Sequence, residues 1–144
     1  MTNSVNIYLT FNGNCEEAFN FYKSVFGGEF AYFSRFKDLP NAESMKFSAV
    51  EQEKVLHLTL PISKETSLMG CDTGSLVPTA GFGNNFWVSV NAKSKSEADR
   101  LFQALSEHGN ILMPMGNTYW GAYFGMFTDK FGINWTVNYR LDQP

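Results

Sequence analysis

The 144-residue chain has few of the residues that mark several common classes of protein. It has two cysteines, Cys15 and Cys71, without the spacing of a metal-binding pair, so we expect reduced thiols rather than a disulfide scaffold. It has no cluster of lysine or arginine, and its net charge is −3, which excludes the usual nucleic-acid and anionic-membrane partners.

Long apolar segments are also missing. No run approaches the roughly 20 apolar residues that a membrane-spanning helix needs. The N-terminal residues Met1-Thr2-Asn3-Ser4 lack the basic and apolar regions of a signal peptide. We therefore expect a cytoplasmic protein that has neither a nucleic-acid nor a membrane partner.

Aromatic residues are abundant. They make up 16% of the chain, and 14 of them are phenylalanine. A chain of this length forms one domain, here residues 1–144, which buries about two-thirds of the surface that the unfolded chain exposes. The surplus of aromatic residues indicates an apolar cavity or a subunit interface, and an ordinary core is the alternative.

The sequence repeats one pattern about 80 residues apart. In each half an extended apolar stretch leads into a helical pattern, and Glu17-Ala18 corresponds to Glu97-Ala98. The repeat predicts two copies of a β-α-β-β-β module. Their predicted ranges are 1–62 for the first module, 63–84 for a loop-rich connector and 85–140 for the second module.

Local signals place the elements of each module. Asn14 is a good N-cap for a helix that Gly27 ends, and Ser96 is the predicted cap of the second helix. Asp129–Gly132 has the composition of a hairpin turn. Further strands are predicted at Asn6–Phe11, Phe30–Phe36, Lys46–Val50, Val55–Leu60, Asn85–Val90 and Asn134–Tyr139.

Two long segments carry a resemblance to a known family. The segments are Tyr8–Ala18, continued by Phe21–Gly28, and Thr118–Gly132, preceded by Met113-Pro114 and followed by Trp135–Asn138. Both resemble the PhnB-like branch of the vicinal oxygen chelate superfamily, which also contains glyoxalase I, bleomycin-resistance proteins and extradiol dioxygenases. The resemblance implies an α+β fold in which paired βαβββ modules form a curved mixed sheet around a cavity, usually in a homodimer.

The resemblance also sets a test for a metal site. Metal-using members of the superfamily take one ligand, normally His, Glu or Gln, from the first and the last strand of each module. Alignment of the apolar strand faces puts these positions at Asn6, His57, Asn85 and Thr136, with His57 corresponding to Thr136. Only His57 is a strong ligand, and the set has no negative charge. We therefore predict that the chain binds no metal and needs no other cofactor.

Candidate ligand-binding residues follow from the same strands. His57 and Thr59 alternate with leucines, so they share the polar face of their strand, which lines either the cavity of the family fold or the solvent. The dense aromatic residues near the C-terminus form either a stacking wall or a packing interface. The predicted ligand contacts are His57, Asn85, Trp87, Trp120, Tyr123 and Thr136.

The sequence favours metal-independent binding of a small, partly aromatic molecule. A second class is an enzyme, either a metal-dependent lyase, isomerase or dioxygenase of the superfamily, or one that uses His57 as a general base. A third is a methyltransferase, as some relatives are labelled, although Gly81-Phe82-Gly83 is too short for a nucleotide-binding glycine loop. No catalytic residue can be named, and the ligand stays open.

Overall fold

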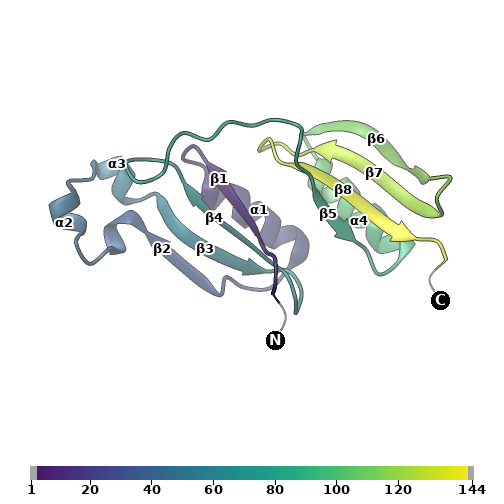
Figure 1. The fold of residues 1–144 in the computed structure, drawn as a ribbon, viewed down its shortest axis with the longest axis horizontal. Coiled ribbons are helices and arrows are strands. Elements are labelled where there is room, and N and C mark those ends of the chain that lie inside the picture. The colour runs from purple at the N-terminus through teal and green to yellow at the C-terminus, as the bar shows by residue number, and fades with distance from the viewer. Residues whose placement is uncertain (1–2, 143–144) are drawn as a thin grey trace. The chain divides into compact units, whose positions relative to one another are not determined.

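The computed structural model describes residues 3–142, and the chain divides into two compact units, Met1–Gly81 and Phe82–Pro144 (Figure 1). Each unit has the order β-α-β-β-β, so the predicted α+β fold of paired βαβββ modules is confirmed. None of the helices in the described part of the chain has the length and apolar character that a membrane span needs.

The first unit forms a four-stranded mixed sheet with the order β1-β4-β3-β2. Strands β1 and β4 are parallel, and the other pairs are antiparallel. Its elements are β1 (Ile7–Phe11), α1 (Cys15–Phe26), β2 (Tyr32–Arg35), the 3-10 helix η1 (Phe36–Asp38), α2 (Ala42–Met45), α3 (Ala49–Gln52), β3 (Val55–Pro61) and β4 (Ser67–Asp72).

Helix α1 packs on one face of this sheet because its apolar side chains meet the apolar side of β1, β3 and β4. Leu9, Phe19 and Leu58 are all buried there. The contact is close at Gly70, where a Cβ atom would lie 2.7 Å from the Phe19 ring and 2.8 Å from the Leu9 carbonyl oxygen. Glycine is therefore required at this point of β4.

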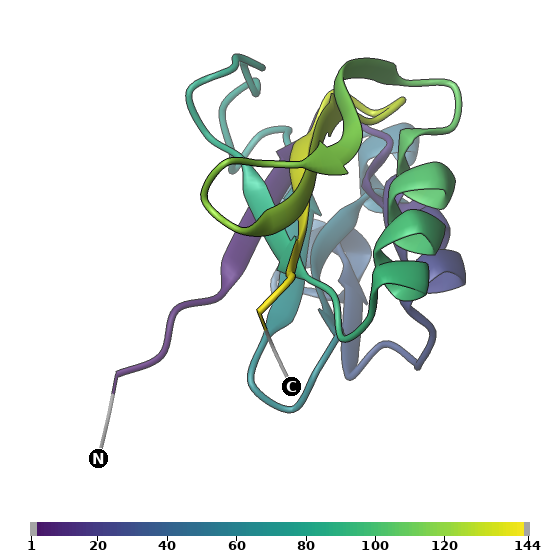
Figure 2. The same ribbon diagram turned by 90° about the vertical axis from the view of Figure 1, so that its right-hand side faces the viewer.

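The second unit repeats this arrangement. Its elements are β5 (Val88–Asn91), α4 (Lys95–Ser106), β6 (Asn110–Asn117), β7 (Ala122–Thr128) and β8 (Asn134–Arg140). The sheet order is β5-β8-β7-β6, with β5 and β8 parallel, and Figure 2 shows α4 along one face of this sheet. Trp135 and Val137 are fully buried, and Phe102 of α4 approaches Gly125 as Phe19 approaches Gly70.

A buried aspartate at the end of β4, Asp72, joins the start of α1 to β3 in the first unit. Asp72 accepts hydrogen bonds from the backbone amides of Gly13, Cys15 and Val55, at 3.0, 2.9 and 3.0 Å. Asn14, the N-cap of α1, makes no capping hydrogen bond with its side chain, so Asp72 satisfies the first amides of the helix instead.

A second buried aspartate, Asp129, organises the turn between β7 and β8 in the second unit. It accepts from the backbone amides of Phe131 and Ile133 and from the indole nitrogen of Trp135. The backbone also closes the turn, because the Asp129 amide donates to Ile133 and the Gly132 amide donates to Asp129. The hairpin turn predicted at Asp129–Gly132 is confirmed.

Several boundaries differ from the predictions. Strand β4 lies inside the stretch 63–84 that the sequence predicts as a connector, so the first module extends beyond residue 62. Residues 46–50 are not a strand, because α3 begins at Ala49. Ser94, not Ser96, caps α4 and accepts from the Glu97 amide. Strand β5 begins at Val88, which leaves Asn85 outside it.

Candidate functional site

The face of the first sheet opposite α1 is called here the open face. Strand register and alternation place eight residues on it: Tyr8, Thr10, Tyr32, Ser34, His57, Thr59, Met69 and Cys71. Their neighbours along the strands, such as Leu9 and Leu58, are buried against α1. The prediction that His57 and Thr59 lie opposite the leucines of β3 is therefore confirmed.

His57 is hydrogen-bonded through both ring nitrogens. Its Nδ1 lies 3.2 Å from the hydroxyl oxygen of Tyr8, and its Nε2 lies 3.2 Å from Oγ1 of Thr59. The Tyr8 ring stacks on the imidazole with centroids 5.5 Å apart and an interplanar angle of 28°, and the Tyr32 centroid lies 5.6 Å away. His57 thus has a fixed position between two aromatic rings.

The open face has no fixed charge. None of its eight residues is Lys, Arg, Asp or Glu. Burial raises the pKa of Tyr8 far above its ordinary value, and a hydrogen bond with Cys71 raises it further. Burial also raises the pKa of the Cys71 thiol. Both groups therefore stay protonated, and Cys71 does not supply the thiolate that a nucleophile or a metal ligand requires.

The second sheet has a corresponding face opposite α4. Thr136 lies there beside Ser89 and Met126, and Phe124 pairs with Asn138. Trp120, which is 57% exposed in the turn after β6, contacts Phe124 edge to face at 5.8 Å. The predicted site residues Trp120 and Thr136 are therefore connected to the same face of the second sheet.

The other predicted residues of the second unit lie elsewhere. Tyr123 is on the α4 side, where its hydroxyl donates to Asp99 at 2.5 Å and Lys95 lies 4.7 Å from its ring centre. The hydrogen bond to Asp99 raises the pKa of Tyr123. Its predicted grouping with Thr136 does not hold, because the two side chains alternate to opposite faces of the sheet.

Asn85 and Trp87 precede β5 rather than form part of it. Asn85 is exposed, whereas Trp87 is half-buried and donates its indole N–H to the Asn84 carbonyl at 2.9 Å. The indole is thus held against its own backbone segment.

The parallel strand pairs correct the comparison of the two modules. The last strand of each module pairs in parallel with its first strand, and these last strands are β4 and β8. Thr10 pairs with Cys71 and Ser89 pairs with Thr136. Cys71 therefore corresponds to Thr136, and His57 lies on the neighbouring strand β3.

This correction bears on the metal test. Asn6 already accepts a hydrogen bond from the Ser67 amide, and Cys71 is a buried, protonated thiol. Within residues 3–142, no three His, Cys, Asp or Glu side chains gather in a group that could hold a metal ion. The donors at the family positions therefore do not fit a divalent metal.

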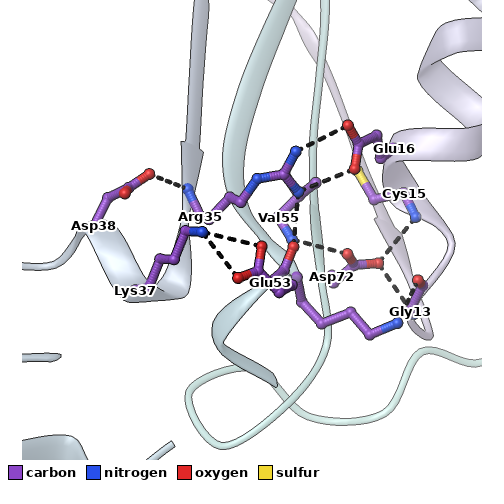
Figure 3. Close-up of polar contacts among 10 residues, drawn as sticks. Gly13, Cys15, Glu16, Arg35, Lys37, Asp38, Glu53, Val55 and Asp72 are labelled. Carbon is purple, nitrogen blue, oxygen red and sulfur yellow. Dashed lines mark hydrogen bonds and ion pairs between the residues drawn. The ribbon is translucent and has the colours of Figure 1, made fainter. Parts of the chain in front are cut away.

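A charged hollow of about 440 Å³ lies elsewhere in the first unit, near the start of α1. Its lining residues are Gly13, Glu16, Arg35, Val50, Glu53, Lys54, Val55 and Asp72. Arg35 donates to both carboxylate oxygens of Glu16, at 2.9 and 3.0 Å, and Lys54 donates to the Gly13 carbonyl (Figure 3). Arg35 also lowers the pKa of Glu16. Each charged group of the lining has a partner within the protein, since Glu53 binds Lys37 and Asp72 binds backbone amides, so we assign these groups to the fold.

Sequence reasoning missed Tyr8, Tyr32 and Cys71 as neighbours of His57. Strand alternation from Asn6 was a sufficient signal for Tyr8, because every second residue of β1 shares a face. Cys71 had no such signal, because its strand was predicted as a connector.

Comparisons with known proteins agree with this architecture. Residues 3–138 match the family model described as 3-demethylubiquinone-9 3-methyltransferase. Protein YjdN of Escherichia coli (strain K12) is 27% identical in an alignment of 146 positions that covers 95% of each chain.

Solved structures extend the match. Protein PA1353 from Pseudomonas aeruginosa is 40% identical with a TM-score of 0.82, over 96% of this chain and 98% of that one. The PhnB protein from Bacillus cereus is 28% identical with a TM-score of 0.74, over 95% and 99% of the chains. A glyoxalase/bleomycin resistance protein from Albidiferax ferrireducens T118, 16% identical with a TM-score of 0.64 over 94% and 96%, shares the fold. The chain therefore belongs to the 3-demethylubiquinone-9 3-methyltransferase family, in the PhnB-like branch of the vicinal oxygen chelate superfamily.

Proposed function

We propose that this protein binds a small, partly aromatic molecule on the open face of its first sheet, without a divalent metal. The observation that carries the proposal is the arrangement of Tyr8, His57 and Tyr32, whose rings lie together on a sheet face that α1 does not cover. Tyr8 and Tyr32 remain 47% and 54% exposed. Exposed aromatic rings beside a few fixed polar groups are typical of small-molecule sites.

The proposed site lies within the first unit. The exposed ring surfaces of Tyr8 and Tyr32 supply binding energy at about 25 cal/mol per Å² of buried apolar area. The contacts expected from the sequence at Asn85, Trp87, Trp120, Tyr123 and Thr136 belong to the second unit and stay predictions.

Homodimer formation is part of the same proposal. Strand β6 is an edge of the second sheet, and its residues Ile111, Leu112 and Met113 are 51%, 53% and 43% exposed. Three consecutive exposed apolar residues on an edge strand favour association with another chain.

The family description names methyl transfer, but the residues described here do not favour it for this chain. A nucleotide-binding glycine loop follows a first strand and opens a helix. Gly81 and Gly83 instead lie in coil before β5, and β1 leads into α1 through Asn12-Gly13-Asn14. We therefore keep binding, rather than methyl transfer, as the proposed function.

A thermal-shift screen of small aromatic compounds on EDTA-treated protein tests the proposal. We expect neutral aromatic compounds to raise the melting temperature, and Tyr32→Ala to weaken binding of a hit by about 1–3 kcal/mol, because it removes one of the exposed rings beside His57. Its melting curve is the control for folding. A folded Tyr32→Ala protein that binds a hit normally would contradict a site on the open face, and a screen without any hit would refute the binding function. Sedimentation of the wild-type protein tests the homodimer separately.

A further inference from the structure

We propose that the open face selects an uncharged planar aromatic molecule with an acceptor oxygen, such as an aryl ketone, over an aromatic anion. This inference rests on the proposed binding function and adds the chemical class of the ligand. Three features of the open face carry it: its ring geometry, its count of hydroxyl protons and its lack of fixed charge.

The ring geometry favours a planar ligand. Tyr8 lies nearly parallel to the His57 imidazole, at 28°, whereas Tyr32 is inclined to it at 51°. Both phenol rings are about half exposed, at 47% and 54%. Each therefore offers accessible ring surface to a flat molecule, and stacked or edge-to-face contacts between aromatic rings are favourable.

A spare hydroxyl proton on the open face predicts that the ligand carries a hydrogen-bond acceptor. A neutral imidazole has one N–H, so Tyr8, His57, Thr59 and Cys71 have four polar protons for the three hydrogen bonds that join them. When His57 Nδ1 accepts from Tyr8, Nε2–H donates to Thr59, and the Thr59 hydroxyl proton remains for a further acceptor. In the other tautomer Thr59 donates to Nε2 and Tyr8 donates to Cys71. The inference therefore uses the first tautomer, with Thr59 as the donor to the ligand.

The charge distribution disfavours an anion. The open face has no Lys or Arg among its eight residues. Arg35 and Lys54 belong to the charged hollow, where they bind Glu16 and the Gly13 carbonyl. A carboxylate or phosphonate on the open face would lose hydration without gaining a positive partner.

The test compares three naphthalenes of similar size by calorimetry at about pH 8, where an ordinary imidazole is neutral. 2-Acetonaphthone is an uncharged acceptor, 2-naphthoate is its anionic counterpart, and 2-ethylnaphthalene has no acceptor. We expect the ketone to bind at least tenfold more tightly than the carboxylate, and about fivefold more tightly than the hydrocarbon, as one hydrogen bond provides.

Two hydroxyl variants locate the effect. Thr59→Val removes the hydroxyl that keeps a free proton but has a side chain of nearly the same size, and we expect it to weaken ketone binding about fivefold and to leave hydrocarbon binding unchanged. Tyr119→Phe is the control for loss of a hydroxyl elsewhere, because Tyr119 is 98% exposed in the turn before β7. Melting curves of both variants confirm that each is folded.

The outcomes separate this inference from the proposed function. Equal or tighter binding of 2-naphthoate, or a Thr59→Val protein that binds the ketone normally, would overturn the inference while leaving an aromatic-binding protein. Failure of all three naphthalenes to bind the wild-type protein would count against both.

Discussion

The two units have similar residues on the sheet faces that their helices cover. They have different residues on the opposite sheet faces. On the covered faces, Phe19 packs at Gly70 and Phe102 packs at Gly125, and the buried aspartates Asp72 and Asp129 each accept three hydrogen bonds. The opposite faces share little. The first has the cluster of Tyr8, His57 and Tyr32, and the second has Thr136, Met126 and Phe124.

This difference indicates which positions serve the fold and which are open to function. A helix must bury its apolar stripe on its sheet, so each copy of the module needs a close contact between helix and sheet, which lies at Gly70 on β4 in the first unit and at Gly125 on β7 in the second. The open face has no such requirement. The divergent open face of the first unit is therefore the better place to look for a specific ligand.

We expect the largest loss of stability when either of the two buried aspartates, Asp72 or Asp129, is replaced. In each, Oδ1 accepts from two backbone amides while Oδ2 accepts from a third donor, the Val55 amide for Asp72 and the Trp135 indole for Asp129. Replacement by alanine leaves three donors without a partner in a buried site. We expect Asp72→Ala and Asp129→Ala each to lower the free energy of unfolding by about 4 kcal/mol, measured by urea denaturation.

An exposed aspartate provides the control. Asp142 forms a 3.2 Å ion pair with Arg140 near the C-terminus, and its side chain is 68% exposed. Asp142→Ala should therefore change stability by less than about 1 kcal/mol. A loss at Asp72 or Asp129 no larger than this would contradict the shared structural role of the two buried carboxylates.

Replacing Gly70 or Gly125 by alanine should cost less stability, and the two losses should differ. At Gly70 an added Cβ would meet the Leu9 backbone carbonyl at 2.8 Å, which cannot move without disturbing β1. At Gly125 the close atoms belong to the Met115 and Phe102 side chains, which can shift. We expect Gly70→Ala to cost about 3 kcal/mol and Gly125→Ala about 1 kcal/mol.

Gly116→Ala on β6 is the matched control for both glycines, because its Cβ would lie 3.9 Å from the nearest atom, the Pro114 carbonyl oxygen. Thermal unfolding of the three variants measures the difference. Equal losses at Gly70 and Gly125 would show that the two helix contacts tolerate change alike.

Much of the fold could be predicted from short sequence patterns, such as helix caps, turn residues and alternating apolar residues. The Asn14 and Gly27 boundaries of α1, the turn at Asp129 and the alternation of β3 and β8 each follow from short patterns. Strand β4 was not predictable in this way. Its sequence, Ser67–Asp72, contains Gly70, which suggests a loop until the Phe19 ring that requires it is known.

The candidate site was predictable only in part. His57 was identified from its strand, and Tyr8 could have been, since alternation along β1 places it on the open face. The hydrogen bond between Tyr8 and Cys71 and the pairing of Cys71 with Thr10 depend on long-range strand pairing. The charged hollow likewise joins residues as distant as Glu16 and Arg35, whose pairing no short motif predicts.

Metal-independent binding is tested most directly by measuring ketone binding with and without divalent metal, beginning with elemental analysis of the purified protein. We expect no stoichiometric zinc, nickel, manganese or iron, and a dissociation constant for 2-acetonaphthone that is the same in EDTA and in added metal, because the donors at Asn6, Cys71, Asn85 and Thr136 do not fit a divalent ion. One tightly held metal per chain, lost in His57→Ala together with ketone binding, would contradict metal-independent binding.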